Sequence, residues 1–237
     1  MAKDQVVVKA DKIKNWHKLG RILKLSLLLL LLLLLIVYIV LRVKFHEGSF
    51  VVNLKSNESL ESGLAIYESL NDRTGKRVLK AENIQFMDNI TYAWLPENID
   101  TEGEGSHNGD NYIAYTFYIE NQGDLVFNYW YSITIDDVIQ NVDEAARIII
   151  YLNGEQTIYA KGNIIDREPE KGTTKFRDDE DGTIILQERQ YLNPGDVDRM
   201  TVVVYLEGND PECINDLLGG ELRMHMDITE EHIPQEV

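Results

Sequence analysis

The hydrophobic pattern divides this chain into one continuous apolar run and a long region of short alternating segments. The run extends from Leu25 to Leu41: these 17 residues carry no charge and include 11 Leu. At about 1.5 Å per residue such a helix is roughly 26 Å long, near the short end of what spans a bilayer. A helix that is apolar on every side has no face to show water, so a buried core helix is excluded. The run therefore predicts a transmembrane helix.

The rest of the chain, from about residue 50, shows repeated β-strand signals. In residues 219–228, Leu222, Met224, Met226 and Ile228 alternate with polar side chains, a period of two that predicts one buried and one solvated face. Residues 147–152 and 156–160 flank Asn153 and Gly154, the strongest short hairpin signal. Further strands are expected at residues 50–55, 76–86, 111–121, 125–135, 183–192 and 199–208.

Two turns and two helices complete this pattern. Residues 121–124, NQGD, predict an antiparallel hairpin between the strands at 111–121 and 125–135, and NPGD at 193–196 predicts another turn. Residues 59–70 and 136–147 have helical periodicity. Many short strands with regularly placed turns indicate an all-β sandwich or barrel.

Net charge separates the two parts further. The chain carries 23 Lys and Arg against 40 Asp and Glu, a net charge of −17. The first 44 residues hold nine basic and two acidic side chains and sum to +7, whereas the other 193 sum to −24. A domain at −24 repels phosphates, so a nucleic-acid partner is excluded.

The basic residues also predict orientation. Seven Lys or Arg precede the apolar run, and only Arg42 and Lys44 follow it closely. The positive-inside rule then places the N-terminus in the cytoplasm and the acidic region outside. A cleavable signal peptide would need small residues before a cleavage site, and RVKFHEGSF after the run offers no such site, which favours an uncleaved signal anchor.

These observations predict five parts. Residues 1–24 form a basic cytoplasmic tail, 25–41 a transmembrane helix in contact with the lipid bilayer, 42–49 a juxtamembrane linker, 50–230 an extracellular β-sandwich and 231–237 a tail. The expected localisation is that of a single-pass plasma membrane protein at the cell surface.

Candidate chemistry is sparse. The five His residues have no metal-binding spacing, and no hydrolase or nucleotide motif occurs, so we expect no enzyme activity and no tightly held cofactor. The acidic cluster at 178–181 could bind calcium loosely through Asp178, Asp179 and Asp181, although four adjacent acids more often form a solvated loop. Cys213 is the single cysteine, which excludes an intrachain disulfide and suggests a packed thiol in a turn.

Residues 111–228 resemble a known family. YTFYIENQGD at 115–124 places an N-x-G turn after a strand, and PGD at 194–196 precedes a long apolar strand and a closing segment. This order is similar to that of the TasA and camelysin group of exported Gram-positive proteins. The resemblance implies a jelly-roll β-sandwich on the cell surface. The apolar run adds one transmembrane helix before it, in which this chain departs from the group.

Three functions are hypotheses at this point. The first rests on the apolar run, the charge division and the absence of catalytic motifs: a structural or interaction role at the cell surface, with other surface proteins or like subunits as partners. The resemblance implies the other two. The second is a subunit or anchor of an extracellular fibre assembled by strand addition. An uncleaved membrane segment argues against the subunit role, because a tethered subunit cannot diffuse into a fibre. The third is a camelysin-like metalloendopeptidase, for which we match no metal ligands in this sequence.

Overall fold

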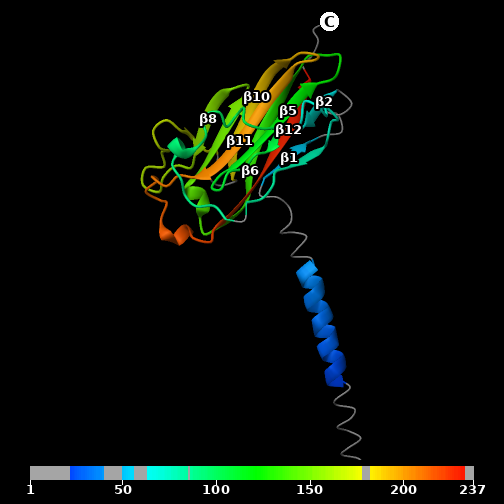
Figure 1. Ribbon diagram of the computed structural model, residues 1–237, viewed down its shortest axis with the longest axis vertical. Helices are drawn as coiled ribbons and strands as arrows, with labels where there is room; N and C mark the ends of the chain where they lie inside the picture. Colours follow the sequence, from blue (N-terminus) through cyan, green and yellow to red (C-terminus); the bar gives the residue numbers. More distant parts are fainter. Residues whose placement is uncertain (1–21, 40–49, 56–62, 85, 178–181, 233–237) are drawn as a thin grey trace, which may run out of the picture. The chain divides into compact units, whose positions relative to one another are not determined.

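The computed structural model describes residues 22–39, 50–55, 63–84, 86–177 and 182–232 of a chain that divides into two compact units, 1–47 and 48–237. The first unit contains one helix, Ile22–Ile39, with a mean hydropathy of 3.0 and no buried side chain (Figure 1). This helix confirms the apolar helix expected from the sequence, but it begins three residues before Leu25. The last two residues of the expected span, 40 and 41, lie outside the described residues.

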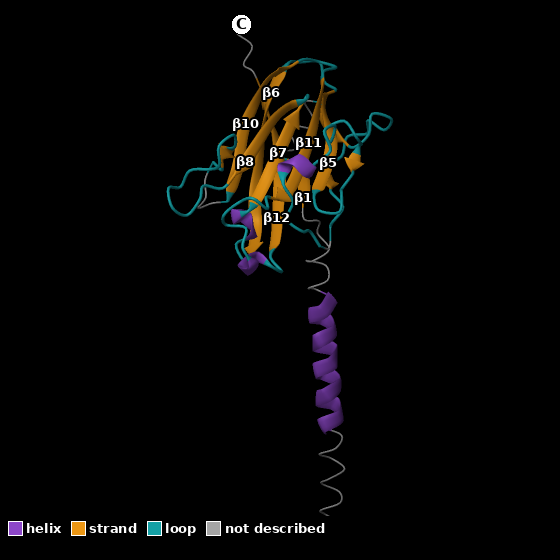
Figure 2. Ribbon diagram, turned by 60° about the vertical axis from the view of Figure 1, so that its left-hand side comes forward, coloured by secondary structure: helices purple, strands orange, loops and turns teal. Residues whose placement is uncertain are grey.

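The second unit is a sandwich of two β-sheets (Figure 2). The five-stranded sheet has the order β10 (Thr183–Leu192), β6 (Phe127–Ile139), β12 (Glu221–His232), β1 (Phe50–Leu54) and β3 (Val78–Lys80). The seven-stranded sheet has the order β2 (Leu64–Tyr67), β5 (Ile113–Asn121), β11 (Val197–Leu206), β7 (Ala146–Leu152), β8 (Glu155–Ala160) and β9 (Thr174–Lys175), with β4 (Gly105–Ser106) also paired to β5. Three short 3₁₀ helices lie in the connections: η1 (Tyr92–Trp94), η2 (Val142–Glu144) and η3 (Asn215–Leu217).

The chain repeatedly crosses from one sheet to the other, as in a jelly roll. From β5 onward it crosses between β5 and β6, β6 and β7, β9 and β10, β10 and β11, and β11 and β12. The all-β sandwich expected from the sequence is therefore confirmed.

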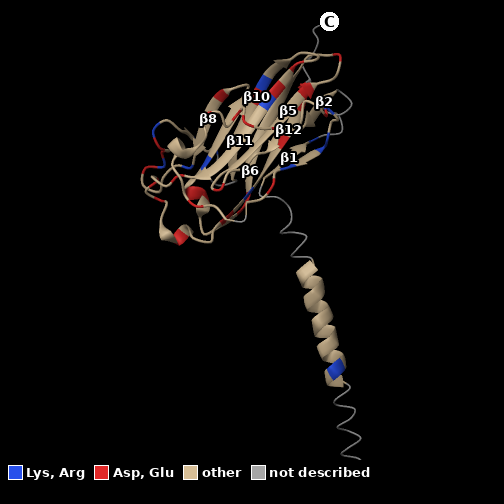
Figure 3. Cartoon of the chain, viewed as in Figure 1, with Lys and Arg blue, Asp and Glu red and all other residues tan. Residues whose placement is uncertain are grey.

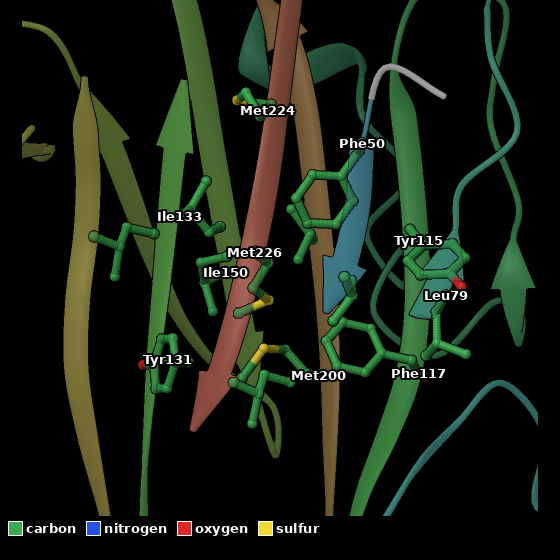
Figure 4. Packing of buried hydrophobic residues seen from close by; sticks show 14 of the residues in the cluster. Phe50, Leu79, Tyr115, Phe117, Tyr131, Ile133, Ile150, Met200, Met224 and Met226 are labelled. Atoms are coloured by element: carbon green, nitrogen blue, oxygen red, sulfur yellow. The ribbon is translucent and has the colours of Figure 1, made fainter. Parts of the chain in front are cut away.

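The main hydrophobic core lies between the inner faces of the two sheets. Met224, Met226 and Ile228 of β12 point into it, which confirms the alternation expected for residues 219–228. Figure 4 shows Met226 near Met200 of β11, with Phe117 of β5 alongside. Fully burying an aliphatic or aromatic side chain contributes roughly 1.5–3 kcal/mol, so these facing layers hold the sheets together.

A second hydrophobic cluster covers the outer face of the seven-stranded sheet. Ile90, Leu95 and Ile99, from the long connection between β3 and β4, pack on outward side chains of that sheet, among them Ile149 and Val203. Both faces of β5 are buried along all nine residues. On the outer face this connection covers Ala114, whereas Tyr118 stacks on Tyr67 and Glu120 pairs with Arg73. The strand expected at 76–86 is correspondingly short: β3 ends at Lys80, where this connection begins.

The predicted hairpin between residues 111–121 and 125–135 is wrong. The two strands exist as β5 and β6, but they belong to different sheets. The Asn121 side chain turns the chain across the sandwich, because its amide donates to the carbonyl oxygens of Leu125 and Leu192 at 2.8 and 2.9 Å. Gly123 N donates to Asn121 Oδ1 and closes the turn.

The two predicted helices are also wrong. Within 59–70, residues Leu64–Tyr67 form β2, paired with β5, while 59–62 lie outside the described residues. Within 136–147, β6 continues to Ile139, paired with Glu221 of β12. Gln140 and Asn141 then adopt positive φ of 58° and 52°, and a single 3₁₀ turn leads into β7. Pairing with distant strands overrides local helical periodicity in both segments.

The Asn153–Gly154 hairpin is confirmed. Both residues have positive φ, 54° and 85°, as a two-residue type I′ turn requires, and they join β7 to β8 in an antiparallel pair.

Candidate functional site

The outer face of the five-stranded sheet carries a polar cluster of hydrogen-bonded side chains centred on His225 and Asp227. Its strands alternate, so the neighbours of the buried Met224, Met226 and Ile228 point outward. His225 and Asp227 of β12 lie beside Asn53 of β1, because β1 and β12 are paired in parallel with Asn53 opposite Asp227.

His225 bridges two carboxylates. Its Nδ1 lies 2.7 Å from Asp136 Oδ1 and its Nε2 lies 3.1 Å from Asp227 Oδ2. A neutral imidazole has one N–H and donates to one of these carboxylates, whereas the protonated ring donates to both.

Asp227 is the centre of this cluster. Besides His225, it accepts a hydrogen bond from Asn53 Nδ2 at 3.3 Å, and Lys55 Nζ lies 2.6 Å from its Oδ2. The Asp227 side chain is only 9% exposed although it points outward, because these neighbours enclose it. The arrangement is a satisfied polar cluster on a surface strand, suited to contacting another polar surface.

The same outer face continues toward β10 through further polar pairs. Trp130 Nε1 on β6 donates to Glu231 on β12, and Asn128 Nδ2 donates to Glu188 Oε1 on β10 at 2.8 Å. The two sheets therefore differ: a long connection covers the outside of one, and polar side chains line the outside of the other.

One end of the sandwich holds two cations paired with carboxylates: Arg147 of β7, which is buried, and Lys161 just after β8, which is half-buried. The Arg147 side chain, 2% exposed, pairs with Asp210 and lies 3.0 Å from Glu170 Oε2. Burial lowers the pKa of Arg147, but these hydrogen-bonded carboxylates outweigh it and raise that pKa above its usual value. Arg147 thus stays charged and joins the loop before β9 to the loop after β11.

Lys161 forms the second link. Its Nζ lies 2.7 Å from both Asp143 Oδ2 and Glu144 Oε1. Burial lowers the pKa of Lys161, yet the two carboxylates outweigh it and raise the pKa. Burial raises the pKa of Glu144, and this outweighs the opposing effect of Lys161.

The candidate residues proposed from the sequence do not meet in one site within the described part of the chain. Asp178, Asp179 and Asp181 lie outside the described residues, so their calcium binding stays a prediction. His107, one of the five His residues without metal-binding spacing, is half-buried, with ring nitrogens 3.1 and 3.0 Å from the carbonyl oxygens of Gly105 and Ile99. Cys213 is half-buried in a turn, 3.4 Å from Asn89 Nδ2, as expected of a packed thiol.

No group of three or more His, Cys, Asp or Glu side chains in the described part of the chain is placed to hold a metal ion. No observation in the described part of the chain therefore supports the metalloendopeptidase alternative, which stays a prediction. Zinc or iron bound tightly to the purified chain, measured by elemental analysis, would revive it. The His225 cluster and the Arg147 link were not predicted, because the strand pairing that assembles them joins residues far apart in the sequence.

Comparisons with known proteins do not assign this chain to a family. The chain matches no model of a known protein family and no curated protein. Among solved structures it is similar to β-glucosidase from Kluyveromyces marxianus in complex with glucose, at 15% identity over 69% of this chain and 15% of that chain, with a TM-score of 0.23. The selenomethionine form of that enzyme gives 14% identity over 73% of this chain and 17% of that chain, with a TM-score of 0.27. The chain thus spans about a sixth of the length of these proteins, and a likeness this weak indicates no function for it.

Proposed function

We propose that this chain is a single-pass membrane protein that presents an acidic β-sandwich outside a Gram-positive cell as a structural or interaction module. The observation that carries the proposal is the helix Ile22–Ile39, whose mean hydropathy is 3.0 and whose side chains are all exposed. Eighteen such residues exposed to water would be strongly unfavourable, and a bilayer removes that cost.

Charge supports the orientation. The excess of Lys and Arg before the helix favours a cytoplasmic N-terminus, and the residues after 44, most of which form the second unit, carry a net charge of −24. The proposed interaction surface is the polar outer face of the five-stranded sheet, where Asp227, His225 and Asp136 form the central cluster.

Protease accessibility tests this topology. The full chain would carry one epitope tag before Met1 and another after Val237, and intact cells would be treated with a non-specific protease. We expect loss of the C-terminal tag and protection of the N-terminal tag until the membrane is permeabilised. The opposite pattern would show that the orientation is wrong, and digestion of both tags in intact cells would show that the chain is not anchored as proposed.

A fibre subunit or anchor is the second candidate, and the edge strand β10 favours it. β10 is ten residues long and lies at the end of the five-stranded sheet, where a strand from another chain could pair with it. The pairing of β10 with β6 shifts between Thr183 and Ile185 and again between Arg189 and Leu192, so the regular part of the edge runs from Ile185 to Arg189. If residues 48–237 stay monomeric at high concentration, with and without calcium, the fibre role is contradicted.

A further inference from the structure

One end of the sandwich gathers exposed aliphatic side chains from three loops. Parallel pairing of β1 with β12 places Phe50 opposite Met224, so both strands begin at this end, and β6 ends there with Ile139 opposite Glu221. Five side chains, which we call the end patch, are exposed here: Ile139 (39%), Ile164 (65%), Ile165 (95%), Ile214 (55%) and Leu218 (69%).

The loops that carry the end patch are tied to each other. Ile164 N donates to Glu212 Oε1 at 2.8 Å, which joins the loop after β8 to the segment that holds Ile214. The Arg147 link with Glu170 and Asp210 joins the same two loops a second time. The loop after β8 and the loop after β11, which carry four of the five side chains, are therefore linked at two points.

Carboxylates surround the end patch. Residues 136–147, 161–173 and 207–221 contain twelve Asp and Glu but four Lys and Arg. Arg147 and Lys161 pair with four of these acids, which leaves two negative charges uncompensated within these pairs, and Asp216 beside the end patch is exposed. In Figure 3 acidic residues colour the short helical turns at this end, where Figure 1 shows η3 in orange.

The tether restricts where this surface can act. Residues 40–49 join the helix to Phe50, and the chain from Ile39 to Phe50 reaches at most about 40 Å. If the helix crosses a bilayer, as proposed above, the end of the sandwich at which β1 begins stays within that reach of the membrane.

We propose that the end patch docks a second membrane or envelope protein at the outer surface of the same membrane, through a contact that presents aliphatic side chains ringed by Lys and Arg. Exposed apolar side chains rimmed by charge are typical of protein or membrane contacts. Anionic lipid headgroups would repel the surrounding carboxylates by up to about 1 kcal/mol per charge, which opposes insertion into a bilayer. A partner surface with an apolar centre and a basic rim would bind both the aliphatic side chains of the end patch and the carboxylates around it.

Site-specific photo-crosslinking in living cells tests this contact. A benzophenone amino acid would replace Ile165 or Leu218 in the full chain, and the matched control position is Leu125, which is 54% exposed in the turn between β5 and β6 at the other end. We expect the same protein adduct from positions 165 and 218 and at most a trace from 125. Mass spectrometry of the adduct should locate the crosslink at an apolar segment flanked by Lys or Arg.

Charge reversal adds a second measurement. Asp216→Lys should reduce the adduct yield about threefold or more, whereas Asp124→Lys, an exposed acid next to Leu125, should leave it unchanged. Adducts with lipid alone, with a second copy of this chain, equally from all three positions, or from none would each overturn the proposal. The protease assay reports separately on topology, so failure of the anchor model and failure of the contact are distinguishable.

Discussion

Tyr129 and Asp198 join the two sheets through the core: the Tyr129 hydroxyl donates a hydrogen bond of 2.7 Å to Asp198 Oδ2. Tyr129 lies on β6 and Asp198 on β11, and both residues are buried. Asp198 also accepts from Asn153 Nδ2 at 2.7 Å and lies 3.1 Å from Arg189 Nε. Burial raises the pKa of Tyr129 well above its usual value, and the nearby Asp198 charge adds to this, so the phenol stays protonated as the donor.

Tyr129→Phe should therefore destabilise the sandwich. Removing the hydroxyl leaves a buried carboxylate with one donor fewer, which we expect to lower the free energy of unfolding by about 1–3 kcal/mol. Urea denaturation of the full chain in detergent, followed by tryptophan fluorescence, measures this change. Tyr191→Phe, at a tyrosine that is 62% exposed, is the control and should change stability little. Equal effects from the two variants would contradict the inter-sheet role.

Arg147→Met tests the buried ion pairs. The substitution leaves Asp210 without its buried cation, and breaking such a pair typically costs about 3–5 kcal/mol. The control is Lys76→Met, since Lys76 and Glu68 are 46% and 33% exposed and an exposed pair contributes less than about 1 kcal/mol. The same denaturation measurement applies, and a loss below 1 kcal/mol for Arg147→Met would show that the loops do not depend on this residue.

Glu68 should make stability depend on pH in the acid range. Burial raises the pKa of Glu68, but hydrogen bonds from Lys76 and Tyr115, at 2.8 and 2.7 Å, outweigh it and lower that pKa below 4.5. A lowered pKa means that the unfolded state binds more protons, so the stabilisation is complete above about pH 4.5 and is lost as pH falls through the folded-state pKa.

Glu68→Gln should consequently be less stable than the parent at pH 7, with a deficit that shrinks as the pH falls below about 4.5 and is lost as the carboxyl of the folded protein becomes protonated. Urea midpoints across this range measure the deficit. Glu155→Gln, at an exposed carboxyl that begins β8, removes the same charge elsewhere and serves as the control. A deficit independent of pH would rule out the ionised carboxylate as its cause.

Gly63→Ala and Gly154→Ala form a matched pair. Both glycines have positive φ, 100° and 85°, so each alanine strains the backbone by roughly 1 kcal/mol. A Cβ at Gly154 meets nothing within 4 Å, whereas a Cβ at Gly63 would lie 2.2 Å from Gly123 N. We expect Gly63→Ala to lower the melting temperature clearly more than Gly154→Ala. Equal decreases in melting temperature would mean that the backbone at Gly63 and Gly123 can move apart to accommodate the Cβ without loss of stability.

Local pattern predicted strands better than it predicted their partners. The Asn153–Gly154 turn could be predicted because the two residues of a type I′ turn are enough to determine the hairpin. The NQGD turn was misread because Asn121 bonds to Leu192, 71 residues away, and this distant contact directs β6 into the other sheet. The same reason explains why the His225 cluster was missed: Asn53 and Asp227 meet through a pairing across 174 residues.

Hydropathy, charge and a period of two are local properties, so the apolar helix, the charge division and the all-β character of the second unit could be predicted from the amino-acid sequence. Three features became visible only in the folded chain: which strands share a sheet, the burial of Arg147 and Asp227, and the position of Ile165 and Leu218 at the end where β1 begins. These features depend on hydrogen-bond pairing and packing between residues far apart in the chain, and no local window of sequence contains that information.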